Sequence, residues 1–460
     1  MPNQPPRGDA PSPVHSLPAH AARLLAGIAQ RDVTVGIIGL GYVGVPLALT
    51  AGEAGFRVLG FDINGPRVEA LNAGRSMIKH IPDERMQAAI AAGRFEATAD
   101  FARLAEADAI LIAVPTPLTR HKEPDLSFVR RTAESIAGAL RPGQLVVLES
   151  TTWPGTTREV VAPILAATGL VEGEDFFLAF SPEREDPGNA RFSTATIPKI
   201  VGADGAAAAA LAQALYQSLV VQVVPVSSTA TAEAVKLTEN IFRSVNIALV
   251  NELKVIFDAM GIDVWEVIEA ARTKPFGFMP FYPGPGLGGH CIPIDPFYLS
   301  WRARRFGIVT RFIELAGEIN TAMPHYVITR LAEAHDARTG RGLRGARILI
   351  LGVAYKKNID DMRESPALVL MDALMKRGSQ VRFHDPFVPV IPPTREHPDL
   401  AGLASVPLDE GILAETDAVL IATDHDGVDY AGLAARDLLV VDTRNAMGAR
   451  GLAGPQIVKA

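Results

Sequence analysis

One loop combines the residue types that covalent chemistry needs. It holds the single cysteine of the chain, Cys291, preceded by Gly288 and His290 and followed four positions later by Asp295. A thiolate is the best nucleophile that a protein offers to an aldehyde carbon, even when only a few per cent of the thiol is ionised. A free cysteine is more often a small buried hydrophobic residue, but core cysteines rarely lie in Gly-rich loops. His290 is either a substrate contact or a hydrogen-bonding residue of the loop.

Three polar residues recur at helical spacing in an otherwise apolar segment. Lys236, Asn240 and Arg243 lie within residues 228–260, a stretch without Pro or Gly that predicts one long helix ending at Gly261. At about 100° per residue, their side chains fall within about 60° of one another. Such a stripe either faces solvent or points into a polar cavity.

A glycine-rich turn near the N-terminus has the pattern of a dinucleotide site. It follows an apolar strand, precedes a helical stretch, and is succeeded by an acid at the end of the next predicted strand. Glycines permit the tight turn and the approach of a pyrophosphate, while the acid binds a ribose diol and repels a 2′-phosphate. The alternative is a glycine-rich turn that binds no ligand. The predicted NAD contacts are Gly39, Gly41, Tyr42, Val43, Gly44 and Asp62.

Further candidates lie near the carboxyl ends of predicted strands, where open α/β sheets bind ligands. Arg67 either contacts the adenosine end of the cofactor or is a surface arginine. Thr116 and Thr151 either border the nicotinamide or cap the following helix. In the last third of the chain, Lys356 and Arg444 follow strand ends and are candidate anion ligands.

The elements that position these residues form two α/β halves. Apolar strands that alternate with helical stretches predict mostly parallel sheets. The predicted strands are 33–39, 56–62, 109–114, 144–149, 176–180, 347–352, 380–385, 418–422 and 438–442. The other predicted helices are 19–30, 263–272, 296–306 and 310–336, and residues 206–226 read as a surface helix followed by a strand. Residues 273–291 contain four prolines and five glycines and predict a shaped loop.

These patterns divide the chain into four parts. We predict a disordered Pro-rich tail at 1–18, an NAD-binding domain at 19–226, a central helical segment at 227–340 and a second α/β domain at 341–460.

Composition excludes several classes of protein. The 51 acids exceed the 44 bases, which gives a net charge of -7 and argues against a nucleic-acid partner. No apolar run is long enough to insert into a membrane, and no signal peptide is recognisable. One cysteine cannot form an intramolecular disulfide or a zinc site built on several thiolates, and no metal site is predicted. The pattern favours a soluble protein of the reducing cytoplasm.

Taken in chain order, the glycine-rich turn, the polar stripe of the long helix, the cysteine loop and the candidate anion ligands of the last third resemble the nucleotide-sugar 6-dehydrogenases, the UDP-glucose/UDP-N-acetylhexosamine dehydrogenase family. The resemblance covers about residues 20–445. The GGHCIPIDP loop and the KLTEN helix segment are the most specific parts. The family oxidises the 6-hydroxyl of the sugar to a carboxylate with two NAD⁺ and one water. The resemblance implies two Rossmann-like doubly wound domains joined by a long central helix, the second of them binding UDP, and a homodimer.

The resemblance also implies catalytic roles. Cys291 matches the nucleophile that forms a thiohemiacetal and then a thioester, while Lys236 and Asn240 match the pair that stabilises the oxyanions. Asp295 matches the carboxylate that works with Lys236 and water in proton transfer, and the sequence leaves open which group accepts the first proton. Glu183 matches the acid of the hydrolytic step.

Thr151 matches the family residue that holds a water associated with the hydrolytic step. The substrate contacts implied by the motif match are Glu183, Arg184, Lys236, Asn240, Arg243, Tyr282, Gly288, His290, Lys356 and Arg444.

Within the family, residues 181–189, residues 274–301 and Arg243 resemble the branch that oxidises UDP-N-acetylglucosamine to its uronate for surface-polysaccharide synthesis. UDP-glucose enzymes usually lack a histidine before the cysteine. The UDP-N-acetylmannosamine branch shares that histidine and usually differs around it. Both sugars stay as alternatives.

Two other functions fit parts of the pattern. A single-step hydroxyacid dehydrogenase also pairs a dinucleotide domain with a helix that carries Lys and Asn, but it needs no thiol and forms one NADH per substrate. A catalytically silent nucleotide-sugar binding protein would keep the scaffold without turnover.

Overall fold

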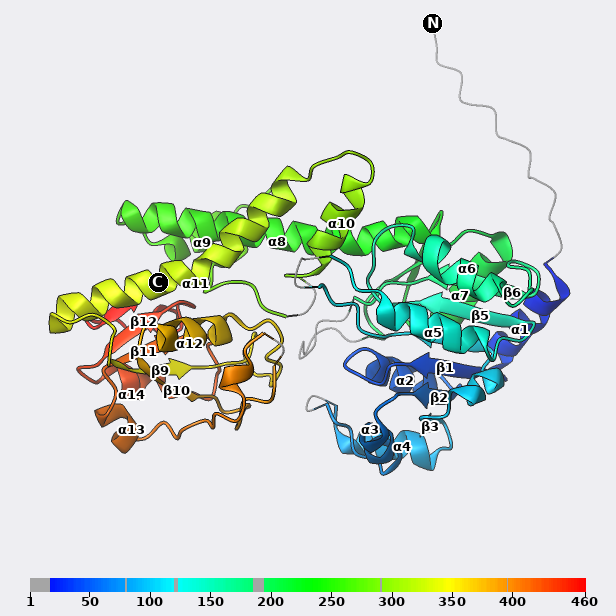
Figure 1. Ribbon diagram of the computed structural model, residues 1–460, viewed down its shortest axis with the longest axis horizontal. Helices are drawn as coiled ribbons and strands as arrows, with labels where there is room; N and C mark the ends of the chain where they lie inside the picture. Colours follow the sequence, from blue (N-terminus) through cyan, green and yellow to red (C-terminus); the bar gives the residue numbers. More distant parts are fainter. Residues whose placement is uncertain (1–16, 79–80, 120–122, 185–193, 290–291, 395) are drawn as a thin grey trace, which may run out of the picture.

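The computed structural model describes residues 17–78, 81–119, 123–184, 194–289, 292–394 and 396–460. His290, Cys291 and residues 1–16 of the predicted tail lie outside the described residues. Two α/β units lie side by side along one long helix, α8 (Thr229–Ala259), which passes over both of them (Figure 1).

The N-terminal unit is built on an eight-stranded sheet of order β3-β2-β1-β4-β5-β6-β7-β8. The first six strands are parallel and have the order of a dinucleotide-binding sheet. β7 pairs antiparallel with β6, and β8 runs parallel to β7. The strands are β1 (Thr34–Ile38), β2 (Arg57–Phe61), β3 (Phe95–Thr98), β4 (Ala109–Ile112), β5 (Gln144–Leu148), β6 (Phe176–Phe180), β7 (Lys199–Ala203) and β8 (Val223–Val226).

Helices cover both faces of this sheet, because successive strand residues point to opposite sides. On β1, Val35 and Ile37 join one buried cluster with Leu211, whereas Ile38 joins the other with Val129. The helices are α1 (Ala19–Gln30), α2 (Gly44–Glu53), α3 (Gly65–Asn72), α4 (Asp83–Ala91), α5 (Ser127–Ala137), α6 (Ala162–Ala166) and α7 (Ala206–Gln217). The predicted surface helix, α7, buries one face against this core.

The central segment is helical, as predicted. α8 (Thr229–Ala259) has 31 residues, so it is about 46 Å long. Ser228 caps its first turn by accepting the N–H of Thr231, and Gly261, at a φ of 70°, follows its end. α9 (Val264–Ala271), α10 (Asp295–Arg304) and α11 (Arg311–Thr339) follow, and α10 and α11 pack against α8. Residues 273–289 form the predicted loop.

The C-terminal unit holds a five-stranded parallel sheet of order β10-β9-β11-β12-β13. Its strands are β9 (Arg347–Leu351), β10 (Gln380–His384), β11 (Ala418–Ile421), β12 (Leu439–Asp442) and β13 (Ile457–Lys459). α12 (Pro366–Lys376) packs with α11 on one face, and α13 (Glu410–Ala414) and α14 (Tyr430–Ala434) cover the other. The predicted fold, two doubly wound sheets joined by a long helix, is therefore confirmed.

Candidate active site

The glycine-rich turn connects β1 to α2 as the motif requires. Gly39 has a φ of 97°, and a Cβ there would overlap the carbonyl oxygen of Ala113. A Cβ on Gly44 would overlap the carbonyl oxygen of Gly39, so neither position accepts a side chain. A Cβ on Gly41 meets nothing within 4 Å, which leaves room for a pyrophosphate against the backbone.

Asp62 lies next to this turn, directly after β2, with 6% of its surface exposed. Its carboxylate accepts the N–H of Leu40 at 3.0 Å and the N–H of Asn64 at 2.9 Å. Arg67 donates to the same carboxylate at 3.0 Å. Arg67 is therefore not a purely solvated surface arginine, because it forms an ion pair with Asp62, the acid that is predicted to bind the ribose.

A cleft of about 1790 Å³ opens at this turn and extends to the C-terminal unit. Its wall from the N-terminal unit includes Gly39, Gly41, Tyr42, Val43, Asp62, Arg67 and Thr116. Residues 360–366 after β9 form the facing wall, and the guanidinium of Arg363 lies 4.9 Å from the centre of the Tyr42 ring. In the N-terminal sheet the cleft lies where the strand order reverses, between the ends of β1 and β4, which is the usual ligand position in such sheets.

A buried polar cluster joins α8 to the first turn of α10. The Asn240 side chain donates to the Asp295 carboxylate at 2.6 Å, and the Lys236 ammonium donates to the backbone oxygen of Glu183. Lys236, Asn240 and Asp295 are each less than 8% exposed. Burial raises the pKa of Asp295 to about 7, while the charge of Lys236 and the hydrogen bond from Asn240 oppose that rise. Asp295 can therefore exchange a proton near neutral pH.

Two of the predicted threonines lie at the carboxyl edge of the N-terminal sheet. Thr116 lines the cleft, and its carbonyl oxygen accepts the Tyr298 hydroxyl at 3.0 Å. Thr151 follows β5 and is half-buried. Between their strands, Ser150 accepts the N–H of Val114 at 3.0 Å and donates to its carbonyl oxygen at 2.8 Å. Ser150 thus fixes the spacing of the two strand ends, a role that the sequence analysis did not foresee.

The structure gives the surroundings of three further predicted substrate contacts. Arg184 donates to Glu239 of α8 at 2.7 Å. Tyr282 stacks on Trp265 with 5.7 Å between ring centres. Arg243 is exposed, whereas Lys236 and Asn240 of the same predicted stripe are buried. Two residues of the predicted stripe therefore point into the protein, and the third, Arg243, faces solvent.

The glycine-rich loop before Cys291 rests on the C-terminal unit. A Cβ on Gly284 would overlap the guanidinium of Arg444, and a Cβ on Gly288 would come within 2.5 Å of the Tyr355 Cβ. The N–H of Gly289 donates to the carbonyl oxygen of Arg363 at 3.0 Å. These glycines allow the loop to lie flat against the segment after β9, which includes the half-buried Lys356.

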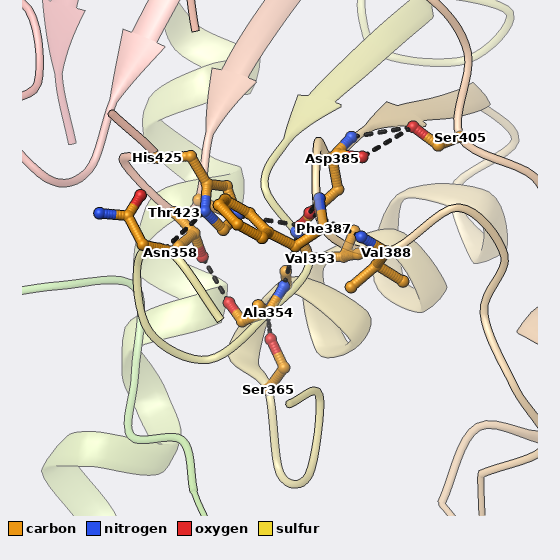
Figure 2. A network of polar contacts seen from close by, with 12 residues as sticks. Val353, Ala354, Asn358, Ser365, Asp385, Phe387, Val388, Ser405, Thr423 and His425 are labelled. Carbon is orange, nitrogen blue, oxygen red and sulfur yellow. Dashed lines mark hydrogen bonds and ion pairs between the residues drawn. The ribbon is translucent and has the colours of Figure 1, made fainter. Parts of the chain in front are cut away.

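The segment after β9 is itself held in place by a buried acid and a buried imidazole (Figure 2). Asp385, directly after β10, accepts the N–H of Val353 at 2.7 Å and the His425 ring N–H at 3.0 Å. The other ring nitrogen of His425 accepts the N–H of Asn358 at 2.9 Å, which fixes the tautomer with the proton on Nε2. Asp385 thus holds the turn after β9 as Asp62 holds the turn after β1.

Comparison with protein-family models covers most of the chain. Residues 33–220 match the NAD-binding domain of the UDP-glucose/GDP-mannose dehydrogenase family, residues 230–322 its central domain and residues 349–449 its UDP-binding domain. The chain belongs to the UDP-glucose/GDP-mannose dehydrogenase family. Its cofactor is NAD.

Individual members of this dehydrogenase family agree with that assignment. The chain is 37% identical to the UDP-N-acetyl-D-glucosamine 6-dehydrogenase of Pseudomonas aeruginosa over 78% of its length and 84% of that relative. It superposes on the UDP-N-acetyl-D-mannosamine dehydrogenase of Pyrococcus horikoshii with a TM-score of 0.83 at 33% identity, covering 93% of this chain and 98% of that one. A UDP-glucose dehydrogenase from Pyrobaculum islandicum gives 0.78 at 29% identity, covering 93% and 96%.

Two structural features are absent from the residues that the structure describes. They contain no helix that is both long enough and apolar enough to span a bilayer. They also contain no group of three or more His, Cys, Asp or Glu side chains placed to hold a metal ion.

Replacing Gly44 with alanine is expected to weaken NAD binding about tenfold to a hundredfold, because the new methyl group must displace the Gly39 carbonyl from the turn. Isothermal titration with NAD⁺ measures this change, and UDP affinity is expected to stay unchanged. Gly205→Ala is the matched control, since a Cβ there meets nothing within 4 Å. Equal NAD affinity in the Gly44→Ala and unmodified enzymes would contradict this reading of the turn.

Proposed function

We propose that this dehydrogenase oxidises the 6-hydroxyl of UDP-N-acetylglucosamine to the carboxylate of UDP-N-acetylglucosaminuronate. The observation that carries the proposal is the buried cluster of Lys236, Asn240 and Asp295. Asp295 of this cluster lies four residues after Cys291, and the next two residues of α10, Pro296 and Phe297, line the NAD cleft. A lysine, an amide and an acid with a pKa of about 7 form a site that can move protons and hold an oxyanion.

The reaction balances as one alcohol, two NAD⁺ and one water giving one carboxylate, two NADH and three protons. NAD supplies the hydride acceptor in both oxidations. Asp295 and Lys236, as a coupled pair, take the proton of the 6-hydroxyl, so that the resulting aldehyde oxygen lies against Lys236 and Asn240.

Cys291 then adds to the aldehyde carbon, and the thiohemiacetal oxyanion that forms is stabilised by the same two side chains. Loss of the second hydride leaves a thioester. Glu183 removes a proton from the water that hydrolyses it, with Thr151 as the residue that holds this water. The adduct keeps the aldehyde on the enzyme between the two oxidations.

The choice of sugar rests on relatives. Those named for N-acetylglucosamine share 35–37% identity with this chain, and those named for N-acetylmannosamine share 35%. We therefore expect kcat/KM to be highest for UDP-N-acetylglucosamine among UDP-glucose and the UDP derivatives of N-acetylglucosamine, N-acetylgalactosamine and N-acetylmannosamine. Rates of NADH formation over a substrate series give these values. A higher kcat/KM for UDP-glucose would overturn the assignment.

We expect UDP to bind against the segment after β9, with Lys356 and Arg444 as its cations. His425→Leu should lower UDP affinity about tenfold, because it leaves the Asn358 N–H without its acceptor and the segment loses its support. Titration with UDP measures the loss, and titration with NAD⁺ on the same sample is the internal control. Unchanged UDP affinity would contradict a role of this segment in nucleotide binding.

We also propose a homodimer built on the central segment. Many large apolar side chains of this segment are exposed, which in quantity marks an association surface. They include Phe242, Leu249, Val255, Ile256, Met260, Phe276, Met279, Phe306, Ile308, Val309, Phe312 and Leu315. Light scattering after gel filtration should give twice the 49.0 kDa chain mass, and Phe312→Asp should shift the protein towards one chain mass. A monomer at all concentrations would refute the dimer.

The cellular setting of the reaction follows from its thiol. A single cysteine that must stay reduced for turnover suits the cytoplasm. There the uronate would feed the synthesis of a surface polysaccharide.

A further inference from the structure

A buried ionic group lies at the carboxyl edge of the N-terminal sheet, beneath Glu183. Glu149 follows β5, Lys199 begins β7 and Tyr216 belongs to α7. The Lys199 ammonium donates to the Glu149 carboxylate at 2.7 Å, and the Tyr216 hydroxyl donates to the other oxygen of that carboxylate. The side chains of Lys199 and Glu149 are 5% and 0% exposed.

Stability does not explain this group well. Taking two charges out of water costs several kcal/mol for each ion, and apolar side chains of similar volume are often as stable or more stable. Burial raises the pKa of the Glu149 carboxyl, and the charge of Lys199 opposes that rise. The contacts that this ion pair makes beyond its two members therefore indicate its role.

Lys199 also faces Glu183. Its ammonium lies 3.9 Å from a carboxylate oxygen of Glu183. On the other side, Lys236 of α8 donates to the backbone oxygen of Glu183. One lysine thus donates a hydrogen bond to the main chain of this residue, and the ammonium of a second lysine lies within ion-pair distance of its side chain.

The reversal of strand direction at β7 creates this contact. β6 and β7 pair antiparallel, with Phe180 opposite Gly202 and Ala179 opposite Ala203. Continuing that register puts Lys199 opposite Glu183, at the ligand-binding edge of the sheet. A parallel β7 would begin at the opposite edge, so the antiparallel pairing is what brings the ammonium to this side.

We infer that Lys199, fixed by Glu149 and Tyr216, is a positioning residue that aims the Glu183 carboxylate at the water that hydrolyses the thioester. The inference rests on the proposed function. In that step the water oxygen bonds to the acyl carbon, the carbon–sulfur bond breaks, the Cys291 thiolate leaves, and Glu183 takes the water proton. Neither hydride transfer uses Glu183, so loss of Lys199 slows hydrolysis selectively.

The test compares two variants by rapid mixing with UDP-N-acetylglucosamine and NAD⁺ in excess. Lys199→Met removes the ammonium. The double variant Glu149→Leu/Lys199→Met removes the whole ion pair, so that no uncompensated carboxylate stays buried. Both should show a burst of two NADH per active site, followed by turnover about 10- to 100-fold slower than in the unmodified enzyme. KM should fall together with kcat, so that kcat/KM changes little, because the acyl-enzyme accumulates. Intact-mass spectrometry should find the acyl group on the enzyme.

Two further variants complete the test. Lys254→Met removes another buried lysine, on α8, and should give neither burst nor adduct. Glu183→Gln should give both the burst and the adduct, because it removes the proton acceptor itself.

A double variant that folds and turns over at the unmodified rate without a burst would overturn the inference. So would equal slowing of both oxidations without an adduct, because that pattern indicates a structural role. If Glu183→Gln itself trapped no adduct, the proposed role of Glu183 would fail, and this inference with it.

Discussion

A Cys291→Ser enzyme is expected to lose complete oxidation by more than about a thousandfold in kcat while it still binds UDP-sugar. A serine hydroxyl is almost entirely protonated at neutral pH, so it adds poorly to the aldehyde, and the second hydride then has no adduct to leave from. The residues expected to bind UDP, Lys356 and Arg444, belong to the C-terminal unit and are not altered. NADH formation measures the first effect and titration with UDP the second.

The matched control is Cys291→Ala, which removes the nucleophile without adding a hydroxyl. Both variants should behave alike in the second oxidation. Full turnover by the serine enzyme would remove Cys291 from the mechanism, whereas loss of UDP affinity in both variants would mean that the loop is needed for binding rather than for chemistry.

Lys236→Met is expected to reduce kcat by at least about 10²–10³-fold, since oxyanions form twice on the same oxygen and this lysine supplies the buried positive charge next to Asn240 and Asp295. The pH dependence should change as well. Lys236 lowers the pKa of Asp295, so its removal raises that pKa above about 7. If ionised Asp295 accepts the proton, the acidic limb of kcat/KM then moves to higher pH.

The comparison variant is Lys236→Arg, which keeps the charge and alters its position. It should keep the acidic limb near its original pH and recover only part of kcat. A Met variant whose residual activity had an unshifted acidic limb would show that Lys236 and Asp295 do not act together.

The elements that the sequence predicts well are those whose own residues carry the signal. α8 begins at Thr229 and ends at Ala259, as the Pro- and Gly-free run and Gly261 indicated. β3 and β7 are absent from the predicted strands, because their sequence signals are weaker. β3 is an edge strand with only two buried residues, Phe95 and Ala97, so it lacks an apolar run. β7 begins with a lysine, whose burial depends on Glu149, 50 positions away.

The same distinction between local and long-range signals applies to the residues of the candidate site. The turn at residues 39–44 and Asp62 could be predicted, because Gly39 and Gly44 answer local steric needs and Gly41 leaves the space that a pyrophosphate requires. The pairing of Asn240 with Asp295, and of Asp385 with His425, joins elements far apart in the chain. Asp385 could still have been found, since it follows the second strand of its sheet as Asp62 does in the first.

The exposure of Arg243 could not be predicted from spacing, because α8 is covered on one side only. His290 and Cys291 lie outside the described residues, so their predicted roles stay predictions.

The account depends most on a four-electron oxidation at one site. The measurement that tests it most directly is the amount of NADH formed per UDP-N-acetylglucosamine consumed, at exhaustion of the sugar with NAD⁺ in excess. We predict two NADH per sugar and a uronate as the product. One NADH per sugar with release of an aldehyde would contradict the account and indicate a single-step dehydrogenase on this scaffold.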